Sequence, residues 1–362
     1  MSLVHVAVDA HNLTRDDRGI GRYARAVLSR ALRAPEFRWT LVVRDVFPNR
    51  RAIARALGAD ADAVEVARRV PRDAGVVWFP WNGTFLRSDA PSVATVHDAA
   101  PFAFPASDAR RRATEQGPFL TTASTARTIL VQSRFTASEV ERWLGVDADR
   151  IVVTPLAVDP VFTARAPADG SRDDRAVLSG DATRSAEESL PAALHGRRYV
   201  LHVGAHDERK NTATLIEGFA RAFPDGDLTL AFTRKPPALP RGGVVVDAPD
   251  DDALAALYRN AALVAMPSTY EGFGLPLLEA LACGAPALAA RAGALPEVGG
   301  DAAAWVDDAH DAAAWAEALG ALLHDDAARA ELAARGPAHA ATFSWERCTA
   351  QTLAVLREAA AA

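Results

Sequence analysis

The stretch MPSTYEGFGLPLLEALACGAP, residues 266–286, combines the end of an apolar strand, a Gly-x-Gly turn and the start of an apolar helix. Pro276 suits the first turn of that helix, where the N–H that proline lacks would have no helical partner. Leucines at 275, 277, 278 and 281 supply an apolar face, and Gly284 is typical of a helix end. The order of strand, turn and helix predicts an α/β unit with a helix start at the carboxyl edge of a parallel sheet.

Two carboxylates, Glu271 and Glu279, flank this turn. A helix start attracts anions, and the glycines of the turn let a ligand approach the backbone amides of Phe273, Gly274 and Leu275. Carboxylates repel phosphate but accept hydrogen bonds from hydroxyl groups. The pattern therefore predicts a ligand with phosphates in its middle and hydroxyls on both sides, which is a nucleotide-sugar. In the alternative interpretation, Glu279 only complements the helix dipole and Glu271 lies on the loop surface.

A second polar loop follows the strand that ends near Gly204, in VLHVGAHDERKNTATLIEGFARA, residues 200–222. Arg209 and Lys210 precede a helix that starts near Thr212, and cations at a helix start oppose its dipole unless an anion joins them. The two side chains would suit a diphosphate; two exposed surface charges are the alternative. We expect a Lys210→Ala variant to lose nucleotide-sugar affinity and turnover while its melting temperature stays near that of the wild type.

Two N-terminal motifs are less specific. Gly19 and Gly21, with Ala24, match a loose dinucleotide fingerprint, and Asp45 follows the next strand. However, residues 11–18 separate these glycines from their strand, which favours a flexible loop that contacts an acceptor. His97 lies at the carboxyl end of another strand, where it is either a sugar or reaction-centre contact or a purely structural histidine.

Short apolar runs alternate with amphipathic segments along the whole chain, which predicts parallel sheets covered by helices. The pattern stops in the polar residues 164–197 and restarts at about residue 198. We therefore expect two doubly wound α/β domains of Rossmann type that face an interdomain cleft. Their predicted bounds are 1–163 and 198–343, with a linker at 164–197 and a C-terminal helix at 344–362 that returns to the first domain.

Composition excludes several classes of protein. The chain has 362 residues, too many for one ordinary core, and a formal net charge of -6 argues against a general nucleic-acid binder. Its two cysteines, Cys283 and Cys348, fit a reducing compartment rather than a disulfide framework. We expect a cytoplasmic protein without a membrane span or a required metal. Peripheral attachment to a membrane through the arginines of SDARRRATEQ, residues 107–116, is an alternative to a solvated helix face.

With these residues assembled, the sequence resembles the retaining glycosyltransferases of family 4, which have the two-domain GT-B fold. EGFGLPLLE is similar to the Glu-x7-Glu signature of that family, VGAHDERKN to its Arg-Lys-Asn loop, and RAGALPEVGGDAA to its next donor-side loop. GIGRYAR, VHDAAPFAFP and VQSRFTASEVERWLGVDADRIVVTPLAVD resemble the N-terminal half of members that build surface polysaccharides. LTLAFTRKPP lacks the glycine usual in the family at that strand end, so recognition of the base stays open.

The resemblance implies a role for each candidate residue. Glu271 would bind hydroxyls of the donor sugar, and Glu279 those of the ribose. Arg209 and Lys210 would hold the diphosphate, together with the amides of residues 273–275. His97 would lie near the reacting face of the donor sugar, and Gly19 and Gly21 would belong to a mobile loop near acceptor and phosphate.

The implied activity is metal-independent transfer of a hexosyl group from a nucleotide diphosphate sugar to a saccharide or lipid-linked saccharide, with retention and without a cofactor. Similarity to mannosyltransferases of O-antigen and capsule assembly favours GDP-mannose, with UDP-glucose and UDP-N-acetylglucosamine as alternatives. Three other classes stay open: a nicotinamide-dependent oxidoreductase using Gly19, Ala24 and Asp45, a glycosidase using Glu271 and Glu279, and a non-catalytic nucleotide-sugar binding module.

Overall fold

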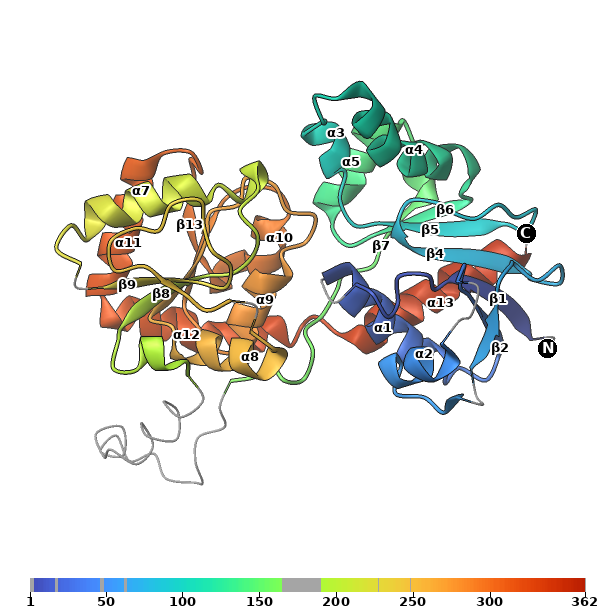
Figure 1. Cartoon of the computed structure of the whole chain (residues 1–362), viewed down its shortest axis with the longest axis horizontal. Coiled ribbons are helices and arrows are strands. Elements are labelled where there is room, and N and C mark those ends of the chain that lie inside the picture. The colour runs from blue at the N-terminus through green and yellow to red at the C-terminus, as the bar shows by residue number, and fades with distance from the viewer. Residues whose placement is uncertain are drawn as a thin grey trace. The chain divides into compact units, whose positions relative to one another are not determined.

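The computed structural model describes residues 3–16, 19–45, 49–61, 64–164, 190–226, 228–247 and 249–361. The chain divides into two compact units (Figure 1). The first comprises Met1–Leu156 and Ser344–Ala362, and the second Ala157–Phe343. The predicted fold class, two parallel-sheet α/β units, is confirmed.

The sheet of the first unit has seven strands within the described residues, in the order β3-β2-β1-β4-β5-β6-β7, and every neighbouring pair is parallel. Its strands are β1 (Val4–Asp9), β2 (Phe37–Val42), β3 (Glu65–Ala67), β4 (Val76–Asn82), β5 (Ser92–Val96), β6 (Thr128–Val131) and β7 (Ile151–Val153). The order reverses between β1 and β4, because the chain first builds outward through β2 and β3 and then returns to the other side of β1.

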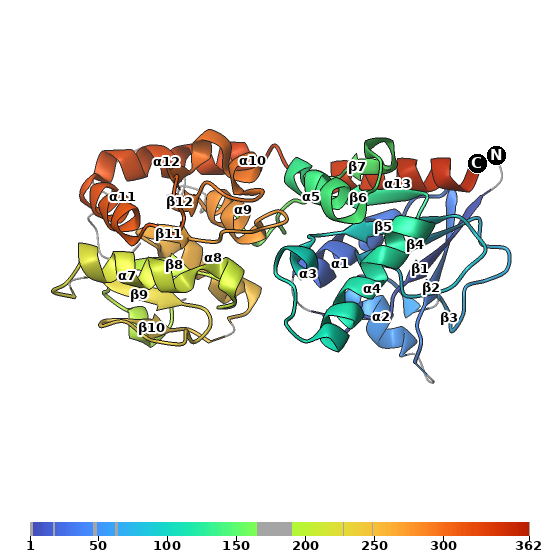
Figure 2. The ribbon, with the colours of Figure 1, turned by 90° about the horizontal axis from the view of Figure 1, so that it is seen from above.

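Helices cover both faces of this sheet. They are α1 (Gly19–Ala31), α2 (Arg50–Ala56), α3 (Ala100–Ala103), α4 (Ala109–Thr125), α5 (Arg134–Leu144) and α13 (Trp345–Ala361). Helix α13, the last of the chain, packs beside α1 and against β1, β4, β5 and β6 (Figures 1 and 2). The Ser344 side chain accepts a hydrogen bond from the N–H of Arg347 at 3.3 Å and so caps the start of this helix.

The sheet of the second unit has six parallel strands within the described residues, in the order β10-β9-β8-β11-β12-β13. These strands are β8 (Tyr199–His202), β9 (Thr229–Phe232), β10 (Val244–Val245), β11 (Leu263–Met266), β12 (Ala287–Ala290) and β13 (Ala304–Val306). Here the order reverses between β8 and β11.

The second unit has six α-helices in its described part: α7 (Thr212–Ala222), α8 (Asp251–Asn260), α9 (Leu275–Ala282), α10 (Leu295–Gly299), α11 (Ala312–His324) and α12 (Asp326–Ala340). Helices α7 and α11 lie side by side (Figures 1 and 2). Their contact requires Gly218, because a Cβ there would lie 2.7 Å from the Cβ of Trp315. Trp315 is fully buried in the core between these helices and the sheet.

Several elements differ from the sequence prediction. Strands β3 and β13 have three residues each and are not preceded by a long apolar run that would predict them. The Ala-rich segment 311–341 forms two helices rather than one, because Asp325 caps the second through the N–H of Ala328. Of the predicted linker, residues 165–189 lie outside the described residues, while Leu190 and Leu194 at its end are buried.

Candidate active site

The residues predicted to bind a nucleotide-sugar follow β8 and β11, the two strands between which the sheet of the second unit reverses its order. Crossovers leave these neighbouring strands in opposite directions, so the loops after them diverge and a ligand can reach the carboxyl ends of the strands. The loop after β8 carries Arg209 and Lys210, and the loop after β11 carries Glu271.

Two sets of contacts join these loops. The Nζ of Lys210 donates to Oε1 of Glu271 at 2.5 Å, and both side chains are buried. The backbone N–H of Thr269 donates to the carbonyl of Arg209 at 2.8 Å, and its hydroxyl contacts the same carbonyl at 3.2 Å. Residues 61 positions apart in sequence thus form one polar cluster.

The charge state of Glu271 follows from this pairing. Burial by itself raises the pKa of a carboxyl group, but the ammonium of Lys210 and the guanidinium of Arg209 hold the pKa of Glu271 below its ordinary value. Glu271 is therefore a carboxylate at neutral pH, able to accept hydrogen bonds from hydroxyl groups. The Nε of Arg209 also donates to Asp207 at 3.3 Å, so each of the two cations of this loop is paired with a carboxylate.

Two residues that the sequence analysis did not assign hold the cluster in place. Asn211 adopts the left-handed region with φ of 50°, and its side-chain amide donates to the carbonyls of Pro267 at 3.2 Å and Ala309 at 2.6 Å. Gly293 has φ of +58°, and a Cβ there would lie 2.7 Å from the backbone nitrogen of Glu271. Apart from the family motif that includes Asn211, the sequence signal was the residue types, since asparagine and glycine are those that most readily adopt positive φ.

Helix α9 begins beside this cluster, at the predicted turn. Gly274 is its N-cap with φ of 100°, and a Cβ there would lie 2.7 Å from the side chain of Leu295. Phe273 is buried and packs edge-on against Phe343, with ring centroids 5.8 Å apart. Leu275 is the first helical residue, so Pro276 lies in the first turn of the helix.

Glu279 lies on α9 and is buried, with 5% of its surface exposed. The hydroxyl of Tyr258, from α8, donates to its Oε2 at 3.0 Å. The alternative interpretation placed Glu271 on the loop surface and is wrong there, because Glu271 is only 6% exposed. Tyr258 could not be found from the sequence, because nothing local links it to a residue 21 positions further on.

The glycines of the first unit begin helix α1. A Cβ on Gly21 would lie 1.7 Å from the carbonyl oxygen of Asp16, so a close approach of the chain's own loop already requires a glycine at this position. Gly19 is the first residue of the helix. Asp45, the acidic residue of the loose dinucleotide fingerprint, forms an ion pair with Arg15 at 2.7 Å.

His97 directly follows β5 and is buried, with 9% of its surface exposed. Its Nε2 lies 2.9 Å from the carbonyl of Pro80, to which it must donate, and its ring packs edge-on against Tyr23 with centroids 4.9 Å apart. Burial lowers the pKa of His97, so the ring is neutral at pH 7. The imidazole therefore has a fixed tautomer whose Nδ1 can accept a hydrogen bond.

Polar side chains also end the neighbouring strands of this sheet, and the sequence analysis missed them. Asn82, at the end of β4, accepts a hydrogen bond from the N–H of His97 at 2.6 Å. Asp9 at the end of β1 and Gln132 after β6 are each 1% exposed. Among the contacts of the described residues, Oδ2 of Asp9 and both polar atoms of the Gln132 amide have no hydrogen-bond partner.

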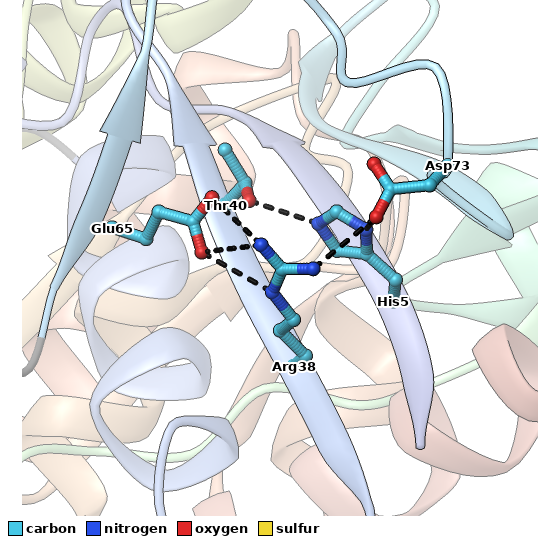
Figure 3. A network of polar contacts seen from close by, with 5 residues as sticks. All are labelled: His5, Arg38, Thr40, Glu65 and Asp73. Carbon is cyan, nitrogen blue, oxygen red and sulfur yellow. Dashed lines mark hydrogen bonds and ion pairs between the residues drawn. The ribbon is translucent and has the colours of Figure 1, made fainter. Parts of the chain in front are cut away.

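A separate polar network joins β1, β2 and β3 (Figure 3). Arg38 binds Glu65 and Asp73, and His5 lies between Asp73 at 3.2 Å and the hydroxyl of Thr40 at 2.9 Å. The order of hydroxyl, imidazole and carboxylate resembles that of a hydrolase, but Thr40 is fully buried within β2 and cannot meet a substrate. The network ties three strands together.

Two α/β units, each with a doubly wound parallel sheet, make up the GT-B fold. Family models match both units: Glycosyltransferase Family 4 over residues 4–162 and Glycosyl transferases group 1 over residues 244–339. O-antigen chain mannosyltransferase B of Escherichia coli is 33% identical over 287 residues, which span 72% of this chain and 69% of that protein. The chain belongs to glycosyltransferase family 4, and the resemblance seen in its motifs is confirmed.

Other relatives match over a shorter part of the chain or in fold. A D-inositol 3-phosphate glycosyltransferase of Salinispora tropica is 50% identical over 111 residues, 30% of this chain and 23% of that protein. The structure of Anabaena HepE with UDP and glucose has a TM-score of 0.71 at 14% identity and covers 98% of this chain and 99% of its own. WaaG, a glycosyltransferase involved in lipopolysaccharide biosynthesis, has a TM-score of 0.66 at 14% identity, with 98% and 99% coverage.

None of the helices in the described ranges combines the length and the apolar character that crossing a bilayer requires.

Proposed function

We propose that the protein transfers a hexosyl group, with retention of anomeric configuration, from a nucleotide diphosphate sugar to a hydroxyl of a saccharide or lipid-linked saccharide. The observation that carries this proposal is the buried pair of Lys210 and Glu271 at the sheet reversal. A cation that can hold a phosphate and a carboxylate that can hold a sugar hydroxyl lie within 2.5 Å of each other. A nucleotide-sugar presents these two chemical groups side by side.

The diphosphate would lie between the cations and the start of α9. Lys210 has three N–H donors, so it can keep its bond to Glu271 and still donate to a phosphate oxygen. Arg209 would supply the second cation, and residues 273–275 lie at the start of α9, where N–H groups favour anions. Glu271 would accept hydrogen bonds from the donor sugar, and Glu279, oriented by Tyr258, from the ribose.

The reaction would be a front-face substitution. The bond between the anomeric carbon and the phosphate oxygen breaks, and its electron pair stays on the phosphate. Arg209, Lys210 and the α9 start would stabilise the charge that builds there. The acceptor oxygen then bonds to the anomeric carbon on the same face, and its proton passes to the leaving phosphate. His97 would contribute Nδ1 to recognition of the donor sugar, while Gly19 and Gly21 would shape the loop near acceptor and phosphate.

We further propose that no divalent metal is required, because two side-chain cations and a helix start supply the positive charge that a metal would otherwise supply. We also propose that the reaction needs no cofactor, because transfer of a hexosyl group from an activated donor changes no oxidation state. Activity that survives extensive dialysis against EDTA would support this, whereas loss on EDTA and recovery with Mg²⁺ or Mn²⁺ would contradict it.

GDP-mannose is the donor that we propose, because a relative that matches 72% of the chain is named an O-antigen chain mannosyltransferase. This also suggests a role in surface polysaccharide synthesis, in the cytoplasm or at the inner face of the membrane. A UDP-sugar is the second candidate, because a solved structure similar in fold holds UDP-glucose.

Thermal-shift measurements against GDP-, UDP-, ADP- and TDP-sugars would identify the base, and proton NMR of the product would identify its anomeric configuration. We expect stabilisation by one nucleotide series and a product with the configuration of the donor. Binding of NADH, release of sugar from a simple glycoside, or donor binding without transfer or hydrolysis would instead favour an oxidoreductase, a glycosidase or a binding module.

The Arg209→Gln variant should lose affinity for the donor that this screen identifies. Arg221→Gln is a matched control, because Arg221 lies on the following helix α7 and pairs with Glu217 on the exposed surface. Equal donor affinities of the two variants would contradict the role of Arg209.

A further inference from the structure

Two histidines and a threonine form a continuous chain of contacts behind Lys210. The Nδ1 of His202 lies 3.1 Å from the carbonyl of Ala265, and its Nε2 lies 3.2 Å from the hydroxyl of Thr212. The same hydroxyl lies 3.0 Å from Nδ1 of His206, whose Nε2 lies 2.7 Å from the carbonyl of Arg234. The chain thus runs from β11 through β8 and the start of α7 to the residues after β9.

Counting hydrogens shows that this chain of contacts requires an additional proton. Each of the four contacts needs one hydrogen, and the carbonyls at the two ends can only accept. The Thr212 hydroxyl supplies one hydrogen, and each neutral imidazole supplies one more. Two neutral histidines therefore leave one contact without a hydrogen, whatever their tautomers. All four contacts are hydrogen bonds only when one of the two rings is an imidazolium.

With all four contacts made as hydrogen bonds, the geometry points to His206 rather than His202 as the ring that donates from both nitrogens. His202 is fully buried between the strands, and burial lowers its pKa to about 4. A neutral His202 must carry its hydrogen on Nδ1, which faces the Ala265 carbonyl, so its Nε2 accepts from Thr212. Thr212 can then only accept from His206, which donates from both ring nitrogens. His206 is half-buried, at the edge of the sheet, where solvent can stabilise its charge.

We propose that His206 is a positioning residue whose imidazolium fastens residues 204–211, the loop of Arg209 and Lys210, and makes the affinity for a nucleotide diphosphate depend on pH. This inference rests on the proposed function, because it assumes that the loop binds the donor diphosphate. When His206 loses its proton, one of its two contacts must break, and the loop is released either from Thr212 or from the carbonyl of Arg234.

The charges around His206 set the direction of the effect. Asp207 follows it in the loop, Arg209 and Lys210 lie on the next turn, and Glu271 pairs with Lys210 from the loop after β11. Two further cations, Arg234 and Lys235, lie in the chain just after β9, whereas His202 on β8 is neutral and adds no charge. A bound diphosphate would add negative charge to this set, so it binds the imidazolium form more tightly. Affinity therefore falls as pH rises through the titration of His206.

The first measurement needs no ligand. Long-range proton–nitrogen NMR of the imidazoles, assigned with single His→Gln variants, reports tautomer and charge between pH 5.5 and 8.5. We expect His202 to stay in the Nδ1–H form throughout and His206 to be an imidazolium at the acidic end. Thr212→Val removes the central hydroxyl, so His206 should then lose its proton at lower pH. A neutral His206 at pH 5.5, or an Nε2–H tautomer of His202, would overturn the proton count.

The second measurement is calorimetry with GDP-mannose and UDP-glucose, whose doubly esterified phosphates do not titrate in this range. We expect affinity for the nucleotide that binds to be about tenfold weaker at pH 8.5 than at pH 6.0, equivalent to about 1.4 kcal/mol, and to vary less than about twofold in His206→Gln. His324→Gln, at the end of α11, is the matched control and should keep the wild-type pH dependence.

A pH-independent affinity in the wild type, or an unchanged pH dependence in His206→Gln, would refute the proposal. Absence of binding by either nucleotide-sugar, combined with the expected NMR result, would instead refute the proposed donor site while leaving the charge on His206 established.

Discussion

Replacing Lys210 by methionine tests the central pair of the site. Methionine keeps the length and most of the volume of lysine but removes its charge, so Glu271 is left in a buried position without the ammonium 2.5 Å away. Removing one partner of a buried ion pair costs about 3–5 kcal/mol, because the remaining charge has no compensation. At about 2–4 °C per kcal/mol for a unit of this size, the melting temperature should fall by roughly 10 °C. From the sequence we expected removal of the Lys210 charge to leave the melting temperature unchanged; because Lys210 is buried against Glu271, we now expect it to fall.

The pH dependence of this loss identifies its cause. In the wild type the pKa of Glu271 is held below its ordinary value, so the pair contributes stability that is present at neutral pH and is lost as pH falls through that pKa. Without Lys210, burial raises the pKa of Glu271 above its unfolded value of about 4.3. The folded variant then binds the extra proton, and its stability falls as pH rises. The variant should therefore be closest to the wild type at pH 5 and furthest from it at pH 8.

Denaturant titrations at pH 5 and pH 8 provide the measurement, with two comparisons. Lys210→Met combined with Glu271→Gln removes both charges and should recover most of the lost stability at pH 8. Arg221→Met breaks the pair with Glu217, which has the same 2.5 Å separation but side chains 51% and 58% exposed. It should change stability by less than about 1 kcal/mol. An equal, pH-independent loss in the two single variants would refute the reasoning from burial.

Two other predictions concern the residues that hold the site. Tyr258→Phe removes the hydroxyl that donates to Glu279 at 3.0 Å. We expect the free energy of unfolding to fall by about 1–3 kcal/mol and nucleotide binding to weaken. Unchanged nucleotide affinity in calorimetry would contradict the contact of Glu279 with the ribose. Gly293→Ala places a Cβ 2.7 Å from the nitrogen of Glu271, so turnover should fall together with stability. Gly196→Ala shares the positive φ, at +66°, but meets no atom within 4 Å. Its free energy of unfolding should fall by only about 1 kcal/mol, the cost of a positive φ for alanine, and its turnover should stay unchanged.

The candidate site was predictable where its signal was local. The glycines around Phe273, the helix that follows them and the paired Arg209 and Lys210 are adjacent in sequence, and their residue types alone indicate phosphate and hydroxyl chemistry. Asn211 was visible only as part of the family motif, since its role depends on the carbonyls of Pro267 and Ala309. Tyr258 had no signal, because its contact with Glu279 joins two helices whose packing no local pattern specifies.

The α/β class, most strands and helices, and the chemistry of the loops that end those strands follow from the amino-acid sequence. Hydrophobic period, turn residues and charge are properties of short segments, so they can be read without knowing what packs against them. The folded structure was needed to show that β8 and β11 are neighbours, that Lys210 is buried against Glu271, and that His202, Thr212 and His206 form one chain of contacts. These depend on contacts between distant segments, and such contacts are set by the packing of the whole sheet.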